Sequence, residues 1–384
     1  MNDVFDLMDE WGPEKVVCVA DQRTGMQGVI VIDNTARGMG KGGTRMSPTV
    51  SVEEIARLAR TMTWKWTAAD LFFGGAKAGI RADPTAKSKE AVLRAWARAL
   101  AKHIPSEYVA GLDMGMNERD SGIIKDELED RGAAVGTPAV LGGVPYDKLG
   151  FTGYGVAEAA AEAAEIAELT LSGATVSIQG FGAVGAAAAK RFAELGSVVV
   201  AISTSAGAIA DDDGLDVPRL LELREAHGDA LVHEYDGART LGAGEELTLP
   251  VDVLVPAACQ DVIDAGVALE LRAKVVVEGA NLPTDAPAQE LLRERGVTVV
   301  PDFVANAGAA VCTGVAMDER RSAFAPDTDA MYAVVKSKLR ANTRTVLERA
   351  QADGVTTRQA ALELTQQRVR EAMEIKGRIR RTEP

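Results

Sequence analysis

The chain has 384 residues, which is more than one ordinary hydrophobic core supports, so we expect two domains. A hydrophobic content of 47% with 26% charged residues is typical of a globular protein in water, and a formal charge of −14 argues against nucleic acid or an anionic membrane as partner. Three scattered cysteines suit a reducing compartment, and three histidines without ligand spacing predict no metal site. With no basic leader and no membrane-length apolar run, the expectation is a cytoplasmic protein.

The first 105 residues predict a small α/β arrangement. Apolar runs at 16–21 and 28–34 indicate an antiparallel hairpin. The segment at 37–45 holds four glycines within six residues and reads as a glycine-dense loop. A capping box at 51–54 opens a helix that runs to about residue 70, and a second helix is expected at about 88–103.

Lys77 lies in LFFGGAKAGI (71–80), an apolar segment with three glycines and no other charge. Glycines let backbones and ligands approach closely. Dry surroundings favour the neutral form of an amine, so a lysine held there can act as general acid or base. Taken alone, the simpler interpretation is a loop lysine whose amine reaches water.

From residue 151 the pattern changes to alternating helices and near-continuous apolar strands, which predicts a parallel sheet with helices on both faces. A boundary is expected near 142–150. We therefore predict a substrate-binding and oligomerisation α/β domain at 1–148, a Rossmann-like doubly wound domain at 149–326, and two long helices at about 327–384 that pack back onto the first domain. The expected strands of the second domain are 174–179, 198–202, 251–255, 274–278 and 297–300, with helices at 152–168 and 183–194.

The segment VSIQGFGAVG (176–185) is a strand that runs into a G-x-G-x-x-G turn and then a helix. Gly180 makes the tight turn, Gly182 lets the backbone approach a pyrophosphate, and Gly185 allows close packing of helix on strand. The helix N-terminus then faces the phosphates. The turn as a whole is the predicted cofactor site: Gly180, Phe181, Gly182, Ala183, Val184 and Gly185.

The choice between NAD and NADP depends on the end of the second strand, AISTSAG (201–207). An acidic residue there would bind the ribose 2′-hydroxyl, but none occurs before Asp211. A 2′-phosphate would not be repelled, and Ser203, Thr204 and Ser205 could donate hydrogen bonds to it. We therefore expect NADP or dual use, although no arginine or lysine is adjacent.

Several segments together resemble the glutamate/leucine/phenylalanine/valine dehydrogenase family, over about residues 41–314. They occur in the family's order: KGGTR (41–45), MTWK (62–65), GGAKAG (74–79), DMG (113–115), TGYGV (152–156), QGFGAVG (179–185), EGAN (278–281) and PDFVANAG (301–308). The resemblance implies NAD(P)-dependent, reversible oxidative deamination of an L-amino acid to a 2-oxo acid and ammonia.

The resemblance also implies residue roles. Lys65 looks like the lysine that holds the substrate α-carboxylate, Lys77 like the catalytic lysine, and Asp113 like its acid/base partner. Read alone, Asp113 is a turn aspartate between glycines. Three further positions look like residues near the nicotinamide or substrate: Thr152, Asn281 and Asn306.

Substrate choice is expected to depend on Lys41 and Thr313, at positions where a glutamate enzyme holds the substrate γ-carboxylate and a leucine-type enzyme has aliphatic residues. A buried charge needs a partner, so Lys41 favours glutamate. Gly42 and Gly111 are expected to line the same pocket. Leu112 and the sequence around Thr313 depart from the glutamate pattern, so a branched-chain or apolar amino acid is the alternative.

A non-catalytic nucleotide-binding sensor on the same fold is a further alternative, which intact Lys65, Lys77 and Asp113 disfavour. The resemblance implies a homo-oligomer, a hexamer or octamer. The expected ligands are small molecules: the amino acid, the 2-oxo acid, ammonia and NAD or NADP.

Overall fold

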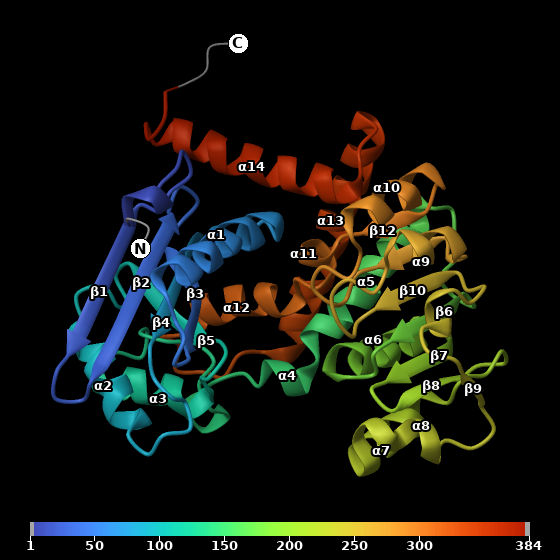
Figure 1. Cartoon of the computed structure of the whole chain (residues 1–384), viewed down its shortest axis with the longest axis horizontal. Helices are drawn as coiled ribbons and strands as arrows, with labels where there is room; N and C mark the ends of the chain where they lie inside the picture. Colours follow the sequence, from blue (N-terminus) through green and yellow to red (C-terminus); the bar gives the residue numbers. More distant parts are fainter. Residues whose placement is uncertain (1–3, 381–384) are drawn as a thin grey trace. The chain divides into compact units, whose positions relative to one another are not determined.

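The structure, a computed structural model, describes residues 4–380 and divides the chain into two compact units. The first unit holds the described residues up to Pro145, Thr313–Thr328, and those from Thr365 onward. The second holds Tyr146–Cys312 and Asp329–Leu364. The three later boundaries, after Cys312, Thr328 and Leu364, each fall within a helix (Figure 1).

The sequence led us to expect that the whole C-terminal stretch packs onto the first unit. The structure instead divides this stretch between the two units. Helix α13 (Thr328–Asp353) lies almost wholly in the second unit, where Arg340 binds the buried Glu158 of helix α5 (Phe151–Ile166) at 2.7 Å. Helix α14 (Thr357–Ile375) returns the chain to the first unit. The expectation of two long helices here is confirmed.

The first unit is built on a five-stranded sheet in the order β1-β2-β4-β3-β5. The hairpin β1–β2 is antiparallel, as predicted, and β2 pairs with β4 antiparallel, whereas β3 runs parallel to both β4 and β5. The strands are β1 (Lys15–Asp21), β2 (Met26–Asn34), β3 (Gly40–Met46), β4 (Gly74–Ile80) and β5 (Tyr108–Leu112).

Helices cover both faces of this sheet. Along β2, Val29 and Val31 pack with Ile55 of α1 (Val52–Ala68), whereas Ile30 and Ile32 face the other way, into a core that includes Trp96 of α2 (Lys89–Ala99). Successive strand residues point to opposite faces, so the continuous apolar run of β2 serves both cores. Helix α3 (Glu118–Glu127) adds to the second core.

The glycine-rich segments around Lys41 and Lys77 are strands, not loops. Glycine has low strand propensity, which hid β3 and β4 from the sequence. Close packing explains their composition: a Cβ on Gly42 would collide with the backbone of Ala76 on β4, and one on Gly75 with Thr63 of α1.

The second unit contains a seven-stranded sheet in the order β12-β11-β10-β6-β7-β8-β9. The first five strands in this order, β12, β11, β10, β6 and β7, are parallel, as predicted. Strands β8 and β9 continue the sheet beyond β7 as an antiparallel edge that the sequence did not predict. The strands are β6 (Thr175–Gln179), β7 (Val198–Thr204), β8 (Gly207–Ala210), β9 (Arg239–Leu241), β10 (Val253–Pro256), β11 (Val275–Val277) and β12 (Thr298–Val300).

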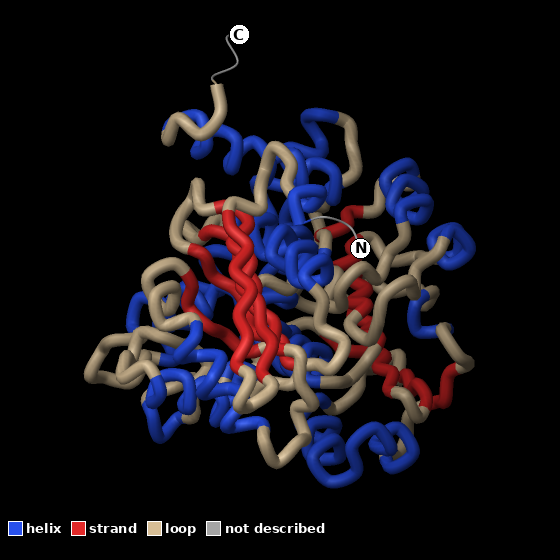
Figure 2. The backbone as a smooth tube through the Cα atoms, turned by 60° about the vertical axis from the view of Figure 1, so that its left-hand side comes forward, coloured by secondary structure: helices blue, strands red, loops and turns tan. Residues whose placement is uncertain are grey.

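Both faces of this sheet are buried as well. Val253 and Val255 of β10 join a core with α5, α6 and α13, whereas Leu254 faces a core with α9 and α10. Figure 2 shows the strands in red with the helices in blue.

The remaining helices are α4 (Tyr146–Leu149), α6 (Ala183–Glu194), α7 (Val217–His227), α8 (Leu231–Glu234), α9 (Ala265–Glu270), α10 (Ala286–Glu294), α11 (Asp302–Ala305) and α12 (Gly308–Glu319). Short 3₁₀ turns are η1 (Val4–Leu7), η2 (Ala139–Leu141), η3 (Gly228–Ala230) and η4 (Glu245–Leu247). Among residues 4–380, no helix combines the length and apolar character needed to cross a membrane.

Candidate active site

Three neighbouring strands of the first unit bring the predicted chemical residues together. Lys41 lies on the central strand β3, and Lys77 lies on β4. Asp113 follows directly after β5 on the other side of β3. Parallel register pairs Lys41 with both Gly75 and Val109, so alternation places Lys77 and Asp113 on the same face as Lys41.

Lys77 and Asp113 form an ion pair across the middle strand, with Nζ 2.6 Å from Oδ2. Gly43 on β3 makes the crossing possible, since its missing Cβ would lie 3.2 Å from the Lys77 Nζ and 2.9 Å from the Asp113 Cβ. Only 7% of Lys77 is exposed. Lys77 is therefore a buried strand lysine with a carboxylate partner, and the loop-lysine interpretation is wrong.

Asp113 is held ionised by cations on two sides. Partial burial opposes its charge, but the charge of Lys77 and its hydrogen bond, the Met114 N–H and the charge of Arg45 outweigh burial, so the pKa of Asp113 lies below its ordinary value. Arg45 Nε lies 3.3 Å from Asp113 Oδ2, and its Nη1 lies 2.6 Å from Glu54 Oε1. Asp113 is therefore a carboxylate at neutral pH, the form that can serve as a proton acceptor.

Lys41 is almost fully buried, with 2% of its surface exposed. Its Nζ donates to the carbonyls of Gly42 at 3.2 Å and Val109 at 3.3 Å. Burial, and then the positive charges of Lys77 and Arg320, lower the pKa of Lys41 to about 7. An ammonium in this position gains from an anion brought beside it.

Gly111 shapes the space around Lys41. A Cβ there would lie 2.6 Å from the Lys41 Nζ, so only glycine leaves the amine where it is. Gly42 supplies the carbonyl that accepts from both Lys41 and the Tyr108 hydroxyl, at 3.2 and 3.0 Å. Both predicted pocket glycines therefore contact or surround the buried amine.

The other two predicted substrate residues belong to the same unit but lie on helices. Lys65 is half-buried in the last turn of α1, two residues after Thr63, which packs against Gly75. Thr313 is half-buried on α12. The next residue, Gly314, lies against Leu71: a Cβ on Gly314 would be 3.3 Å from the Leu71 Cδ2.

In the second unit the glycine turn has the geometry that a pyrophosphate needs. Gly180 has φ of +87°, and a Cβ there would lie 2.7 Å from the Ala258 Cα. A Cβ on Gly185 would collide with the Gly180 carbonyl. Gly182 is the N-cap of α6, and no atom of the described residues lies within 4 Å of its Cβ position or caps the helix through a side chain. The first N–H groups of α6 therefore face open space. The residues present fit a dinucleotide.

The rest of this turn holds the strand ends together. Phe181 is buried, and its N–H donates to the Ser203 carbonyl at 2.6 Å. Ala183 is exposed at the start of α6, and Val184 is half-buried where a Cβ on Gly279 would come within 3.4 Å of it.

Asn306 and Asn281 lie together: Asn306 Nδ2 donates to Asn281 Oδ1 at 3.0 Å and to the Gly279 carbonyl at 3.4 Å. The Asn306 Oδ1 is buried and has no hydrogen-bond partner among the described residues. Thr152, at the start of α5, is half-buried, and its Cα would lie 3.2 Å from a Cβ on Gly308. These amides suit a polar group such as a carboxamide.

The end of β7 differs from the sequence expectation. Ser203 is buried and its hydroxyl accepts from the Gly180 N–H at 3.0 Å. Thr204 donates its hydroxyl proton to the Asp229 carbonyl at 2.7 Å, and Ser205 donates to Asp229 Oδ2 at 2.5 Å. The premise that no carboxylate reaches this strand end is therefore wrong, because Asp229 arrives from η3, 24 residues after Ser205.

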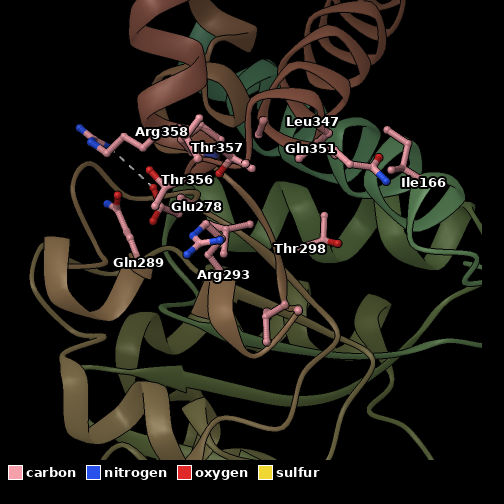
Figure 3. A pocket seen from close by; sticks show the side chains of 17 residues that line it. Ile166, Glu278, Gln289, Arg293, Thr298, Leu347, Gln351, Thr356, Thr357 and Arg358 are labelled. Carbon is pink, nitrogen blue, oxygen red and sulfur yellow. Dashed lines mark ion pairs between the residues drawn. The ribbon is translucent and has the colours of Figure 1, made fainter. Parts of the chain in front are cut away.

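A separate cavity of about 420 Å³ lies in the second unit beside the α13–α14 turn (Figure 3). Its wall includes Glu278, which is fully buried. Burial, and then the charge of Asp302, raise the pKa of Glu278 to about 7. Arg358 binds Asp302 at 2.7 Å. It also lies 3.9 Å from Glu278 (Figure 3), so the two carboxyls share this cation.

Sequence reasoning missed Arg45, Arg320 and Asp229. Arg45 ends the KGGTR segment on the same strand face as Lys41 and Gly43, a period-2 signal that the loop interpretation obscured. Arg320 and Asp229 come from distant segments without a local signal. Within residues 4–380, no cluster of three or more His, Cys, Asp or Glu side chains could hold a metal.

A glycine turn with an open helix N-terminus, together with a buried lysine–aspartate pair in a separate unit, defines a dinucleotide-dependent enzyme of the dehydrogenase class. Comparison with known protein families indicates the same class of enzyme. The profile described as Glutamate/Leucine/Phenylalanine/Valine dehydrogenase matches residues 142–377, and that described as Glu/Leu/Phe/Val dehydrogenase, dimerisation domain, matches residues 13–130. The chain belongs to this family and is an NAD(P)-dependent amino acid dehydrogenase.

Relatives are similar over most of their length. Glutamate dehydrogenase from Aeropyrum pernix is 34% identical over 90% of this chain and 85% of its own. NADP-specific glutamate dehydrogenase from Saccharolobus shibatae is 36% identical over 78% of this chain and 74% of its own. The solved Leu-bound form of hetero-hexameric glutamate dehydrogenase from Thermus thermophilus has a TM-score of 0.79 and 30% identity, and covers 99% of this chain and 93% of its own.

Proposed function

We propose that this enzyme catalyses the reversible oxidative deamination of L-glutamate to 2-oxoglutarate and ammonia. The observation that carries the proposal is the buried Lys41 ammonium on the strand face that also bears the Lys77–Asp113 pair, with Nζ and Oδ2 of that pair 2.6 Å apart. Within the described residues 4–380 the Lys41 amine pairs with two carbonyls and no carboxylate, and a buried cation of this kind favours a substrate that brings one. The similarity to glutamate dehydrogenases supports the same substrate.

In this proposal Lys65 binds the substrate α-carboxylate, and Lys77 and Asp113 move the protons. When bound, the nicotinamide would supply the acceptor for the hydride of the substrate Cα. Lys77 first passes a proton to the Asp113 carboxylate, 2.6 Å away. Its neutral amine then orients and deprotonates the water that adds to the substrate iminium, and the ammonium that results stabilises the oxygen as charge develops on it. Asp113, held ionised by Lys77 and Arg45, accepts a proton and returns it to the departing amino group.

The outer end of the substrate pocket is proposed to hold the γ-carboxylate through Lys41, with Gly42 and Gly111 shaping the space and Thr313 donating a hydroxyl. One observation favours the runner-up, a branched-chain or apolar amino acid. Val109, whose carbonyl accepts from Lys41, packs with Val135 and Met317 in an apolar cluster close to the same amine.

The cofactor is proposed to lie on the turn formed by residues 180–185, with its pyrophosphate at Gly182 and the α6 N-terminus. Asn306, Asn281 and Thr152 are proposed to hold the nicotinamide end, where the buried Asn306 Oδ1 would accept a hydrogen bond from the carboxamide. Thr204 would lie at the adenosine end. Members of the family use NAD or NADP.

We further propose a homo-oligomer, a hexamer or octamer, formed through the first unit. Strand β1 lies at the edge of its sheet, beside a cavity of about 700 Å³ that Val4, Leu7 and Val19 line. A profile named for dimerisation matches this region, and the Thermus thermophilus relative is hetero-hexameric. The free thiols of Cys18, Cys259 and Cys312 support a cytoplasmic location.

Replacing Lys77 by alanine tests the catalytic proposal and separates it from a non-catalytic sensor. We expect turnover of glutamate to fall by about 10³-fold or more, while calorimetry still detects binding of NADH or NADPH. Lys125→Ala is the matched control, a half-buried lysine of the same unit on α3. Turnover that survives Lys77→Ala would show that the proposed mechanism is wrong.

A further inference from the structure

We infer that Asp229 selects NAD over NADP by accepting a hydrogen bond from the adenosine ribose 2′-hydroxyl. This inference rests on the proposed function and names a specificity residue for its cofactor. In a doubly wound domain the acidic residue that binds this hydroxyl stands at the carboxyl end of the second strand. In this chain that strand is β7, which ends at Thr204, and its own sequence supplies no acid there.

Asp229 fills the gap from another segment. It lies in η3, between α7 and α8, and two hydrogen bonds fix it at the end of β7: the Thr204 hydroxyl donates to its carbonyl at 2.7 Å, and the Ser205 hydroxyl donates to its Oδ2 at 2.5 Å. The first bond anchors the backbone and the second orients the carboxylate. The carboxylate is thereby held at the end of the second strand, where dinucleotide-binding folds of this kind place the acid that binds the ribose.

The same carboxylate has capacity left for a ligand. An ionised aspartate offers about four acceptor sites, and the Ser205 hydroxyl uses one of them. Asp229 is exposed, so a ribose can reach it. A 2′-hydroxyl is a donor and suits this acceptor, whereas a 2′-phosphate brings negative charge against negative charge.

The neighbouring hydroxyls do not reverse this preference. Thr204 and Ser205 both direct their protons at Asp229, and the Ser203 oxygen accepts from Gly180 within the turn. The two hydroxyls that face solvent at this strand end are thus donors to Asp229 rather than to a phosphate. The sequence expectation of NADP or dual use rested on these hydroxyls being available.

The test is calorimetric binding of NADH and NADPH, and of ADP-ribose with and without a 2′-phosphate, to the full chain and to Asp229→Asn. Asparagine keeps the size and an acceptor for Ser205 but removes the charge. We expect the wild type to bind NADH more tightly, and the NADH-to-NADPH preference to fall by about tenfold or more in Asp229→Asn. Asp213→Asn is the control, an equal change of charge on an exposed aspartate in the turn after β8.

Two results would overturn the inference: a wild type that binds NADPH more tightly, or an Asp229→Asn preference equal to that of Asp213→Asn. Binding needs no amino acid substrate, so failure of the proposed function is distinguishable. A chain that shows the Asp229-dependent preference yet does not deaminate any amino acid would contradict the proposed function alone. Thermal unfolding of each variant checks that the fold is retained.

Discussion

Replacement of Lys41 by leucine is the sharpest test of how this enzyme chooses its substrate. The Lys41 amine is buried and donates only weakly, to two carbonyls at 3.2 and 3.3 Å. A glutamate γ-carboxylate brought beside it would form a charged pair away from water. Without the amine, that carboxylate would be buried without a cation.

The size of the effect follows from this burial. Loss of one partner of a buried charged pair costs about 2–5 kcal/mol, which corresponds to a decrease of about 30-fold to several thousand-fold in kcat/KM for glutamate. Norvaline, a straight-chain substrate without the carboxylate, should gain in Lys41→Leu because a desolvated amine no longer faces its side chain. The ratio of the two kcat/KM values should therefore invert.

The assay follows NAD(P)H formation with glutamate and norvaline in the wild type, Lys41→Leu and the control Lys125→Leu. The pKa of Lys41 is about 7, so its amine loses its charge as pH rises through that value. In the wild type the glutamate-to-norvaline ratio should decrease above about pH 7, and in Lys41→Leu it should not change with pH. A Lys41→Leu enzyme that still prefers glutamate would refute the assignment of this pocket.

Three further changes probe other parts of the structure. Gly111→Ala adds a Cβ 2.6 Å from the Lys41 Nζ, so we expect a loss of about tenfold or more in kcat/KM for glutamate with a smaller effect on norvaline; equal losses on both would contradict the assigned geometry. Gly182→Ala fills the open space at the start of α6, so calorimetry should show NADH binding weakened by about tenfold or more, with an unchanged melting temperature. The control Gly242→Ala, whose Cβ would have Glu245 Oε2 as its nearest atom at 3.6 Å, should bind NADH normally. Glu278→Gln removes a carboxyl whose pKa is raised from 4.5 to about 7. Ionisation of that carboxyl lowers the free energy of unfolding by up to about 3 kcal/mol above pH 7 and has no effect below pH 4.5. The melting temperature of the variant should therefore exceed that of the wild type at pH 8 and approach it at pH 5. A gain independent of pH would point to another cause.

Much of the second unit could be predicted from the sequence. Its parallel strands are buried on both faces, so they read as continuous apolar runs, and the glycine turn follows the first of them. The antiparallel edge formed by β8 and β9 could not be predicted in the same way, because their sequences, GAIA and RTL, lack the run of branched apolar residues that marks the parallel strands. Asp229 was missed for a related reason: it reaches β7 through the fold and not through sequence spacing.

The first unit was harder to predict because glycine replaces the usual strand residues. In β3 and β4 the glycines let strands and α1 approach, and Gly43 leaves a path for Lys77 to reach Asp113. Composition therefore indicated loops where the structure has the middle of a sheet. The residues of the site were recognisable by resemblance, but their pairing depends on parallel register, which the sequence alone did not specify.

We propose above all that the chain oxidises L-glutamate with NAD or NADP as acceptor. Initial rates of cofactor reduction with a panel of L-amino acids, including glutamate, leucine, valine and norvaline, test it most directly. The buried Lys41 predicts that kcat/KM is highest for glutamate, by at least about tenfold over the apolar amino acids. Activity on leucine or valine above that on glutamate would contradict the account.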